Sequence, residues 1–288
     1  MTPAALAALT ASIGLMYVLG ARIFASTRMG IVTVALFALT PLLWLQGRQA
    51  PASLEPLPFV VGWLLAAAHI QHDRAGWWPV AAGGCLGAGV YTSQAAVVMM
   101  PLYLVLTVAV MAHARAAPLR HVVLLAAAFF VVAAPFAVSL LRHPEGFRDT
   151  VNAYHLYDAN RFSLRQGVRE MASWVGLTAR TEVYYDYFNP AFLFLTGRVL
   201  LFPLAVLLPV GIGHIVSSET VPIARLSIAG FVVAPFAASL TAQAPTPGRI
   251  LFITPFAAIV SAYGMKRLLS WRPSFFAGSS PLVRSRRP

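Results

Sequence analysis

The sequence predicts an all-α fold, a polytopic transmembrane helical bundle of about nine spans, on three observations. Hydrophobic residues make up 59% of the 288 residues and charged residues only 10%, whereas soluble domains usually carry roughly 25% charged residues. The hydrophobic residues form blocks close to the length of about 20 residues that crosses a bilayer as a helix. Most basic residues lie at the ends of these blocks, where they report topology.

The expected spans follow one another along the whole chain. They cover residues 5–20, 29–46, 57–70, 77–92, 95–112, 121–141, 198–216, 222–240 and 250–268. A polar break from Tyr91 to Gln94 separates the fourth block from the fifth. Such a break could also bend one long helix, so eight spans is the alternative. Gly83 and Gly87 form a GxxxG motif in the fourth block, which favours close helix packing over a binding site.

Basic residues in the short connections indicate the orientation, because cytoplasmic loops are enriched in Arg and Lys. With nine spans and the N-terminus outside, twelve basic residues fall in cytoplasmic segments and two, Arg48 and Arg249, in short outer loops. The twelve are Arg22, Arg28, Arg74, Arg115, Arg120, Arg225, Lys266, Arg267, Arg272, Arg284, Arg286 and Arg287. The C-terminus is therefore expected in the cytoplasm, and the protein in the cell membrane as a multi-pass protein.

This topology divides the chain into four parts. They are N-terminal transmembrane helices 1–141, an extracytoplasmic insert 142–197, C-terminal transmembrane helices 198–270 and a basic cytoplasmic tail 271–288. Seven of the nine acidic residues then lie on the outer face, namely Glu55, Glu145, Asp149, Asp158, Glu170, Glu182 and Asp186. Acid–base chemistry is expected on that face.

An amphipathic interfacial helix is expected in the insert. Apolar residues recur there at helical spacing, and basic residues follow a second face. The apolar set is Leu164, Val168, Met171 and Val175, and the basic set is Arg161, Arg165 and Arg169. This pattern is typical of a helix on a membrane surface, and equally of a helix that caps the bundle. An aromatic stretch from Tyr184 to Pro190 follows, as at the interfacial end of a span.

Three charged residues of the outer loops are candidates for a site. Glu55 stands at the start of the third span. An ionisable group at this position suggests a functional residue. An alternative of equal weight is a carboxylate that is stabilised by the helix dipole. Arg48 in the same loop and Arg249 before the last span are candidate phosphate clamps, because a guanidinium binds phosphate through paired hydrogen bonds. Arg249 has an equal alternative as a snorkelling interface residue.

Other classes of function find little support. The sequence contains no P-loop, HExxH, GxSxG or dinucleotide-binding motif. His69 and His72 lie at the end of the third span, and their pattern indicates a solvated helix end rather than a metal site. Cys85 is the single cysteine, so no intrachain disulfide forms. No cofactor and no metal site are expected, although a divalent metal stays open. Nucleic acid is not an expected partner, because 20 of the 21 basic residues are Arg and most of them lie at the ends of apolar blocks.

Five segments, taken in order, resemble the membrane segments of GT-C glycosyltransferases. They are Tyr17–Phe24, Ala38–Leu42 with Arg48 and Glu55 downstream, Gly84–Thr92, Tyr184–Phe194 and Pro247–Pro255. The pattern is similar to that of the polyprenyl-phosphate-sugar-dependent enzymes related to protein O-mannosyltransferases and the lipid A aminoarabinose transferase. The resemblance covers about residues 5 to 270.

The resemblance implies transfer of a sugar from a polyprenyl-phosphate carrier to an acceptor on the extracytoplasmic face. Glu55 matches an acidic position of the second outer loop and is the expected catalytic carboxylate, and Arg249 matches the basic residue before the last helix. The expected site for substrate or lipid phosphate comprises Arg48, Arg249, Tyr185, Tyr187 and Asn189. The family's first helix and its loop with the principal catalytic Asp have no counterpart, so the chain is expected to begin at the family's second helix.

Three functions stay open at this point. The chain is a glycosyltransferase, active or inactive in this form, with a membrane lipid, a polyprenyl-phosphate-linked sugar and an unidentified glycan, lipid or protein acceptor as partners. It is alternatively a non-catalytic relative or membrane partner that keeps the lipid-phosphate groove. The third function is a lipid or small-molecule transporter, which should show acidic residues in mid-span or matched broken helices; no Asp or Glu lies well inside an expected span.

Overall fold

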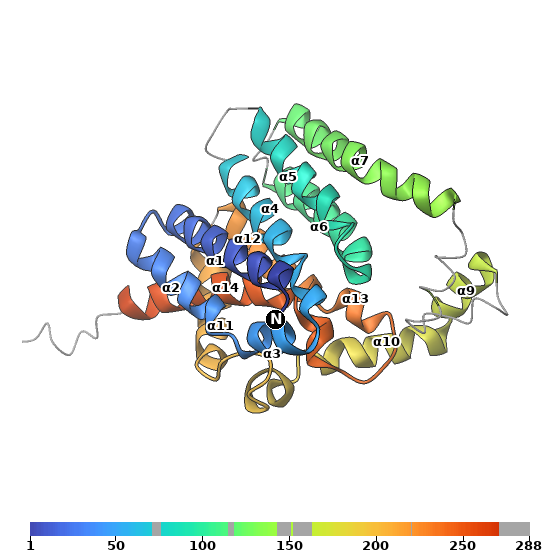
Figure 1. Ribbon diagram of the computed structural model, residues 1–288. Coiled ribbons are helices and arrows are strands. Elements are labelled where there is room, and N and C mark those ends of the chain that lie inside the picture. Colours follow the sequence, from blue (N-terminus) through green and yellow to red (C-terminus); the bar gives the residue numbers. More distant parts are fainter. Residues whose placement is uncertain (71–75, 115–117, 143–150, 152–162, 220, 271–288) are drawn as a thin grey trace, which may run out of the picture.

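The computed structural model describes residues 1–70, 76–114, 118–142, 151, 163–219 and 221–270, and no strand occurs among them. The helices of the N-terminal part are α1 (Pro3–Phe24), α2 (Thr27–Ala38), α3 (Pro41–Gln49), α4 (Leu57–Ile70), α5 (Trp77–Gly89), α6 (Gln94–His113) and α7 (Leu119–Arg142). They are followed by α9 (Leu164–Met171), α10 (Trp174–Asp186), α11 (Leu204–Ser218), α12 (Pro222–Val233), α13 (Phe236–Ser239) and α14 (Ile253–Ser270). Short helical turns occur at η1 (Pro51–Leu54), η2 (Ala191–Leu195) and η3 (Pro247–Ile250). Figure 1 shows the packed bundle with α9 set apart from it.

Five helices of the described residues are long and apolar enough to cross a membrane: Pro3–Phe24, Pro51–Ile70, Gln94–His113, Leu119–Leu140 and Pro222–Ser239. The segment expected as the second span is two helices, α2 and α3, bent by 45°, and it makes a sixth span if the pair is counted as one. An all-helical fold with several apolar helices is therefore confirmed for the described residues, and the number of spans, nine or eight, stays a prediction.

Side chains of the connections decide where the helices begin. Ser93 caps α6 by accepting a hydrogen bond from the Ala96 amide at 3.2 Å, which satisfies one of the free N–H groups at the helix start. The polar break from Tyr91 to Gln94 thus ends α5 and starts a new helix. Thr2 caps α1 in the same way, with Pro3 in the first turn, where a missing N–H costs nothing.

Glycines let two pairs of helices approach closely. A Cβ built on Gly83 would overlap the backbone carbonyl of Leu125, and one on Gly87 would lie 2.8 Å from Cβ of Val132, so the GxxxG face of α5 packs directly on α7. The expectation of close helix packing for this motif is confirmed. Gly211 of α11 and Gly264 of α14 show the same close approach in the C-terminal part, as small residues do in membrane bundles.

Several described connections that are predicted to lie on the outer face meet at one end of the bundle. Contacts join η1 to α1, η3 to α3 and α13, and α10 to α13, so the predicted outer connections meet at one end. At the other end, Glu219 contacts Nε2 of His214 at 3.5 Å and Nζ of Lys266 at 3.8 Å. Which end faces the cytoplasm stays a prediction, as do the four-part division and the placement of tail 271–288, which lies outside the described residues.

The amphipathic helix of the insert is shorter than its sequence pattern. α9 ends at Met171, and Ser173 caps α10 by accepting a hydrogen bond from the Gly176 amide at 3.1 Å, so Val175 belongs to the second helix. Arg161 lies outside the described residues. The exposed apolar side chains include Trp174, which is 81% exposed, and Val175, which is 76% exposed. The exposed apolar surface therefore includes the start of α10 as well as α9, and an interfacial role for it stays a prediction.

Candidate functional site

A cavity of about 790 Å³ opens at the predicted outer end of the bundle, and we call it the first cavity. Separated parts of the chain supply its walls: Ser53 and Pro56 beside η1, Tyr91 to Gln94 between α5 and α6, Phe136 and Leu140 of α7, and Thr241, Arg249 and Phe252 around η3. Most of the lining is apolar. A volume in this range suits a small molecule or part of a lipid.

Arg249 is the one charged side chain among the described residues that line the first cavity. Its Nη1 donates to Oγ1 of Thr241 at 2.9 Å, and its Nη2 donates to Oε1 of Gln243 at 2.6 Å. Both acceptors are neutral, and no carboxylate of the described residues pairs with the guanidinium. Because these two partners use only two of its five N–H groups, the half-buried guanidinium has further donors for an anion.

The loop that carries Arg249 is held from the side of the insert. Tyr187 at the end of α10 is fully buried, and its hydroxyl accepts a hydrogen bond from the Thr246 amide at 3.4 Å. Burial raises the pKa of the Tyr187 phenol, while the contacts with Thr246 and the positive charge of Arg249 act in the opposite direction. Tyr187 therefore positions the loop as a neutral phenol.

Arg180 joins α10 to the segment after α13. Its Nε donates to the Leu240 carbonyl at 3.1 Å, and its Nη1 donates to the Gly176 carbonyl at 2.9 Å. Leu240 and its neighbour Thr241 both line the first cavity. The insert thus takes part in shaping the cavity, although Arg180 itself does not line it.

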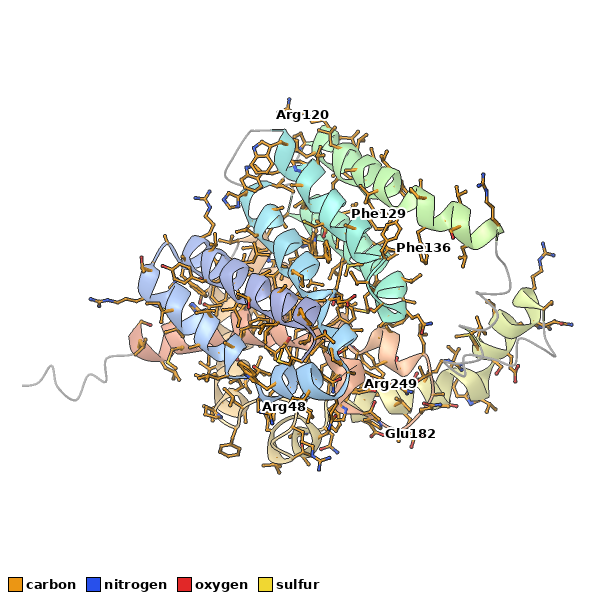
Figure 2. The ribbon with its side chains drawn as sticks, in the orientation of Figure 1. Arg48, Arg120, Phe129, Phe136, Glu182 and Arg249 are labelled. Carbon is orange, nitrogen blue, oxygen red and sulfur yellow. The ribbon has the colours of Figure 1, made fainter. Side chains whose placement is uncertain are left out.

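α7 closes the side of the first cavity that faces α5 and α6. The Tyr91 hydroxyl donates to the Val132 carbonyl at 2.7 Å and accepts from the Phe136 amide at 3.2 Å, beside Pro135 within α7. A side-chain hydroxyl that bonds a helix backbone at a proline is a recognised site of bending. Figure 2 shows Phe136 on α7 above the end of α6, and its ring meets the Tyr91 ring edge to face at 5.7 Å.

The structure separates the residues that the sequence places in one site. Figure 2 shows Arg48 and Arg249 at the same end of the bundle, with Arg120 at the opposite end. Arg249 lines the first cavity, whereas Arg48 is exposed on α3 and lines neither that cavity nor a second, smaller cavity on the other side of the loop that carries Arg249. Glu55 is half-buried between Leu54 and Pro56, and it is also absent from both linings. Its carboxylate has no hydrogen bond or ion pair within the described part of the chain.

The three predicted residues of the aromatic stretch take different positions. Tyr185 is 67% exposed and lines neither cavity. The side-chain oxygen of Asn189 accepts a hydrogen bond from the Ala191 amide at 2.9 Å, which fixes the start of η2. Tyr187 alone reaches the loop of Arg249, and it does so through the backbone of Thr246. None of the three lines either of the two cavities, so their predicted contact with substrate stays a prediction.

Sequence reasoning missed Thr241 and Gln243, the partners of Arg249. Both lie in a short connection that is neither strongly apolar nor charged, so hydropathy gives them no weight. Their closeness to Arg249 in the sequence could have indicated them, because residues of one short loop between two spans lie near one another. In the described residues, no group of three or more His, Cys, Asp or Glu side chains is arranged to hold a metal ion.

A second cavity of about 430 Å³ lies on the other side of the same loop. α3 supplies Gln46 and Gln49, and Arg198, Thr246 and Gly248 complete its polar side. Gly248 lines both cavities. The segment from Thr246 to Arg249 is therefore the wall between them.

No protein-family model matches the chain, and no curated protein sequence matches it. One solved structure that does match is the crystal structure of ArnT from Cupriavidus metallidurans bound to undecaprenyl phosphate. The likeness has a TM-score of 0.63 at 16% sequence identity, and it covers 92% of this chain and 45% of ArnT. This chain thus spans less than half the length of that protein. At this identity the likeness shows the fold alone: the chain shares the fold of the part of ArnT that it covers.

Proposed function

We propose that the chain is a GT-C-type membrane protein that binds a polyprenyl-phosphate-linked sugar in the first cavity and takes part in transferring that sugar. Arg249 carries the proposal, because its guanidinium has only neutral partners among the described residues and stands in a mostly apolar cavity. A lipid phosphate has the matching chemistry, an anionic group on an apolar chain. The structural neighbour was bound to undecaprenyl phosphate.

The proposed reaction needs two kinds of assistance. A bond forms between an acceptor oxygen and the anomeric carbon while the bond from that carbon to the phosphate oxygen breaks, and the electron pair stays on the phosphate. Arg249 would stabilise this developing charge. The acceptor loses its proton to a base, and Glu55 is our candidate for that role. In the present structure Glu55 lies beside the first cavity rather than in its lining, so the role requires a shift of the segment around η1.

A second candidate function is binding of the lipid phosphate without transfer. It is favoured by one observation, namely that no Asp, Glu or His of the described residues lines the first cavity. The two candidates share the role of Arg249 and differ in the role of Glu55. Binding assays therefore test both candidates together, and transfer assays separate them.

The position in the membrane belongs to the same proposal. We place the two cavities on the extracytoplasmic face, the C-terminal end in the cytoplasm, and the exposed apolar side chains of α9 and α10 in the outer membrane surface. The excess of basic residues in the predicted cytoplasmic loops supports this orientation. It also puts Arg249 where a lipid phosphate group lies, at the boundary between hydrocarbon and water.

The test is the affinity of the chain in lipid nanodiscs for undecaprenyl phosphate. Arg249→Ala should weaken binding about 10- to 100-fold, because a charge-assisted hydrogen bond contributes about 1.5–3 kcal/mol. Arg249→Lys should recover part of the loss, since it restores the charge without the paired donors. Arg28→Ala, which removes an exposed Arg at the opposite end of α1 from the cavities, is the control for net charge. Equal affinity of Arg249→Ala and the unaltered chain would overturn the proposal.

A further inference from the structure

The Tyr91 hydroxyl is inserted into the backbone hydrogen bonding of α7. It donates to the Val132 carbonyl at 2.7 Å and accepts from the Phe136 amide at 3.2 Å. In an uninterrupted α-helix, a carbonyl and the amide four residues later form a hydrogen bond with each other. Pro135 in the same turn has no N–H group, and a proline ring crowds the carbonyl four residues before it. This turn of α7 therefore depends on a side chain from the connection between α5 and α6.

The two ends of α7 differ in their support. The main packing partner of α7 among the described residues is α5, where Gly87 packs against Val132. α5 ends at Gly89, whereas α7 continues to Arg142. The side chains of residues 137–140 are exposed, and Figure 1 shows this end of α7 standing away from the rest of the bundle. The inserted hydroxyl and the aromatic ring that carries it therefore attach this end to the bundle.

The weakly supported end of α7 forms a wall of the first cavity. We call residues 136–140 the outer segment, and Phe136, Ser139 and Leu140 of this segment line the cavity together with Arg249. A ligand that brings a phosphate group to Arg249 on a polyprenyl chain must keep the chain in hydrocarbon, because moving a long apolar chain through water is strongly unfavourable. Such a ligand therefore enters between helices from the membrane rather than from water.

We propose that the outer segment of α7 is a lid on the first cavity, and that Tyr91 is the positioning residue that holds this lid. The lid swings about the turn from Val132 to Phe136, and the apolar chain of the lipid phosphate enters the cavity sideways beside it. The inference rests on the proposed function, because it takes the lipid phosphate as the ligand.

The backbone of α7 has a hydrogen-bonding partner in both positions of the lid. When the lid is closed, the Tyr91 hydroxyl bridges the Val132 carbonyl and the Phe136 amide. When the hydroxyl withdraws, these two backbone groups form a hydrogen bond with each other as in a regular helix. No backbone group is then left without a partner in hydrocarbon, where such a group is costly. The turn can therefore exchange between two arrangements.

The first experiment measures how fast undecaprenyl phosphate enters and leaves the chain within one nanodisc bilayer, by phosphorus exchange NMR. Tyr91→Phe keeps the ring and removes the hydroxyl, so it weakens the closed position of the lid. Both rates should rise about fivefold, the factor that corresponds to one hydrogen bond of ordinary strength. The affinity should stay within about twofold, because the ligand passes the same lid on entry and on exit.

The control for the rates is Tyr17→Phe, which removes the hydroxyl of an exposed tyrosine on α1 and should leave both rates unchanged. A faster dissociation alone, with a matching loss of affinity, would show that Tyr91 contacts the ligand directly, and it would overturn the inference. Unchanged rates in Tyr91→Phe would overturn it as well.

The second experiment follows the lid without any ligand, by distances between pairs of spin labels in a Cys85→Ser background. Val138→Cys in the outer segment and Val123→Cys near the start of α7 are each paired with Val105→Cys on α6, and all three valines are exposed. Tyr91→Phe should broaden or shift the distances from position 138 and leave those from position 123 unchanged.

The outcomes separate the lid from the proposed function. No change at position 138, or an equal change at positions 123 and 138, would mean that Tyr91 does not hold a separate lid, and it would overturn the inference. Failure of undecaprenyl phosphate to bind, or binding that does not depend on Arg249, instead overturns the proposed function. The spin-label distances need no ligand, so they test the lid in either case.

Discussion

The contact between α5 and α7 should be the most sensitive part of the bundle to a single methyl group. At Gly83, a Cβ would overlap the Leu125 carbonyl and lie 3.0 Å from Cβ of Ala128. A backbone carbonyl cannot rotate away, so the helices must separate. At the adjacent Gly84, no atom lies within 4 Å of the added Cβ. Gly84→Ala is therefore a matched control on the same turn of the same helix.

The expected difference between the two variants follows from these contacts. Overpacking at Gly83 should cost about 1–3 kcal/mol. Gly84→Ala should gain up to about 1 kcal/mol, because Ala is a better helix former than Gly. The variants should thus differ by about 1–4 kcal/mol in the free energy of unfolding.

Thermal unfolding in detergent micelles, followed by tryptophan fluorescence, measures the difference. Gly83→Ala should unfold several degrees below the unaltered chain and Gly84→Ala at or above it. The reasoning is refuted if both variants unfold at the same temperature, or if Gly83→Ala is the more stable. Gly83→Ala should also weaken binding of undecaprenyl phosphate, because the outer end of α7 lines the first cavity; Gly84→Ala should not.

Three further changes test the site and the insert. Tyr187→Phe should weaken binding of undecaprenyl phosphate roughly 3- to 10-fold, because it removes a hydrogen bond of about 1 kcal/mol to the Thr246 amide; Tyr17→Phe on α1 is the control, and equal affinities would exclude a positioning role. Glu55→Gln should lower sugar transfer about 100-fold with little change in lipid-phosphate affinity, and unchanged turnover would remove Glu55 as the base. Trp174→Cys in a Cys85→Ser background allows an environment-sensitive dye to be attached at the start of α10. Lipid-borne quenchers should quench the fluorescence of this dye if α10 lies in the interface. Quenching by aqueous iodide alone would contradict the interfacial position.

The helical fold could be read from the sequence because its cause is local. A chain segment in hydrocarbon must satisfy its own backbone hydrogen bonds, so an apolar block of sufficient length becomes a helix whatever its neighbours are. Polar punctuation such as Ser93 then marks where a helix begins. The number of spans was harder to predict, because the bend between α2 and α3 and the short length of α5 depend on packing rather than on composition.

The candidate site was only partly predictable, for a different reason. Arg249, which lines the first cavity, is conspicuous in the sequence as a cation next to a span, and its role in binding stays a prediction. Arg48 and Glu55 are just as conspicuous, yet they line neither cavity, since the direction of a side chain depends on the angle at which its helix packs. Gln46 was overlooked because an amide at the end of an apolar block carries no signal of its own.

The sequence by itself determined that this protein is a bundle of apolar helices with its acidic and aromatic residues gathered in particular connections, because hydropathy and charge act on each segment separately. Only the tertiary structure decided that Gly248 meets Gln46, two residues some 200 positions apart. That contact depends on α3 and η3 meeting at one end of the bundle. The same meeting of distant segments divides the outer end into one cavity with Arg249 and another with Gln46.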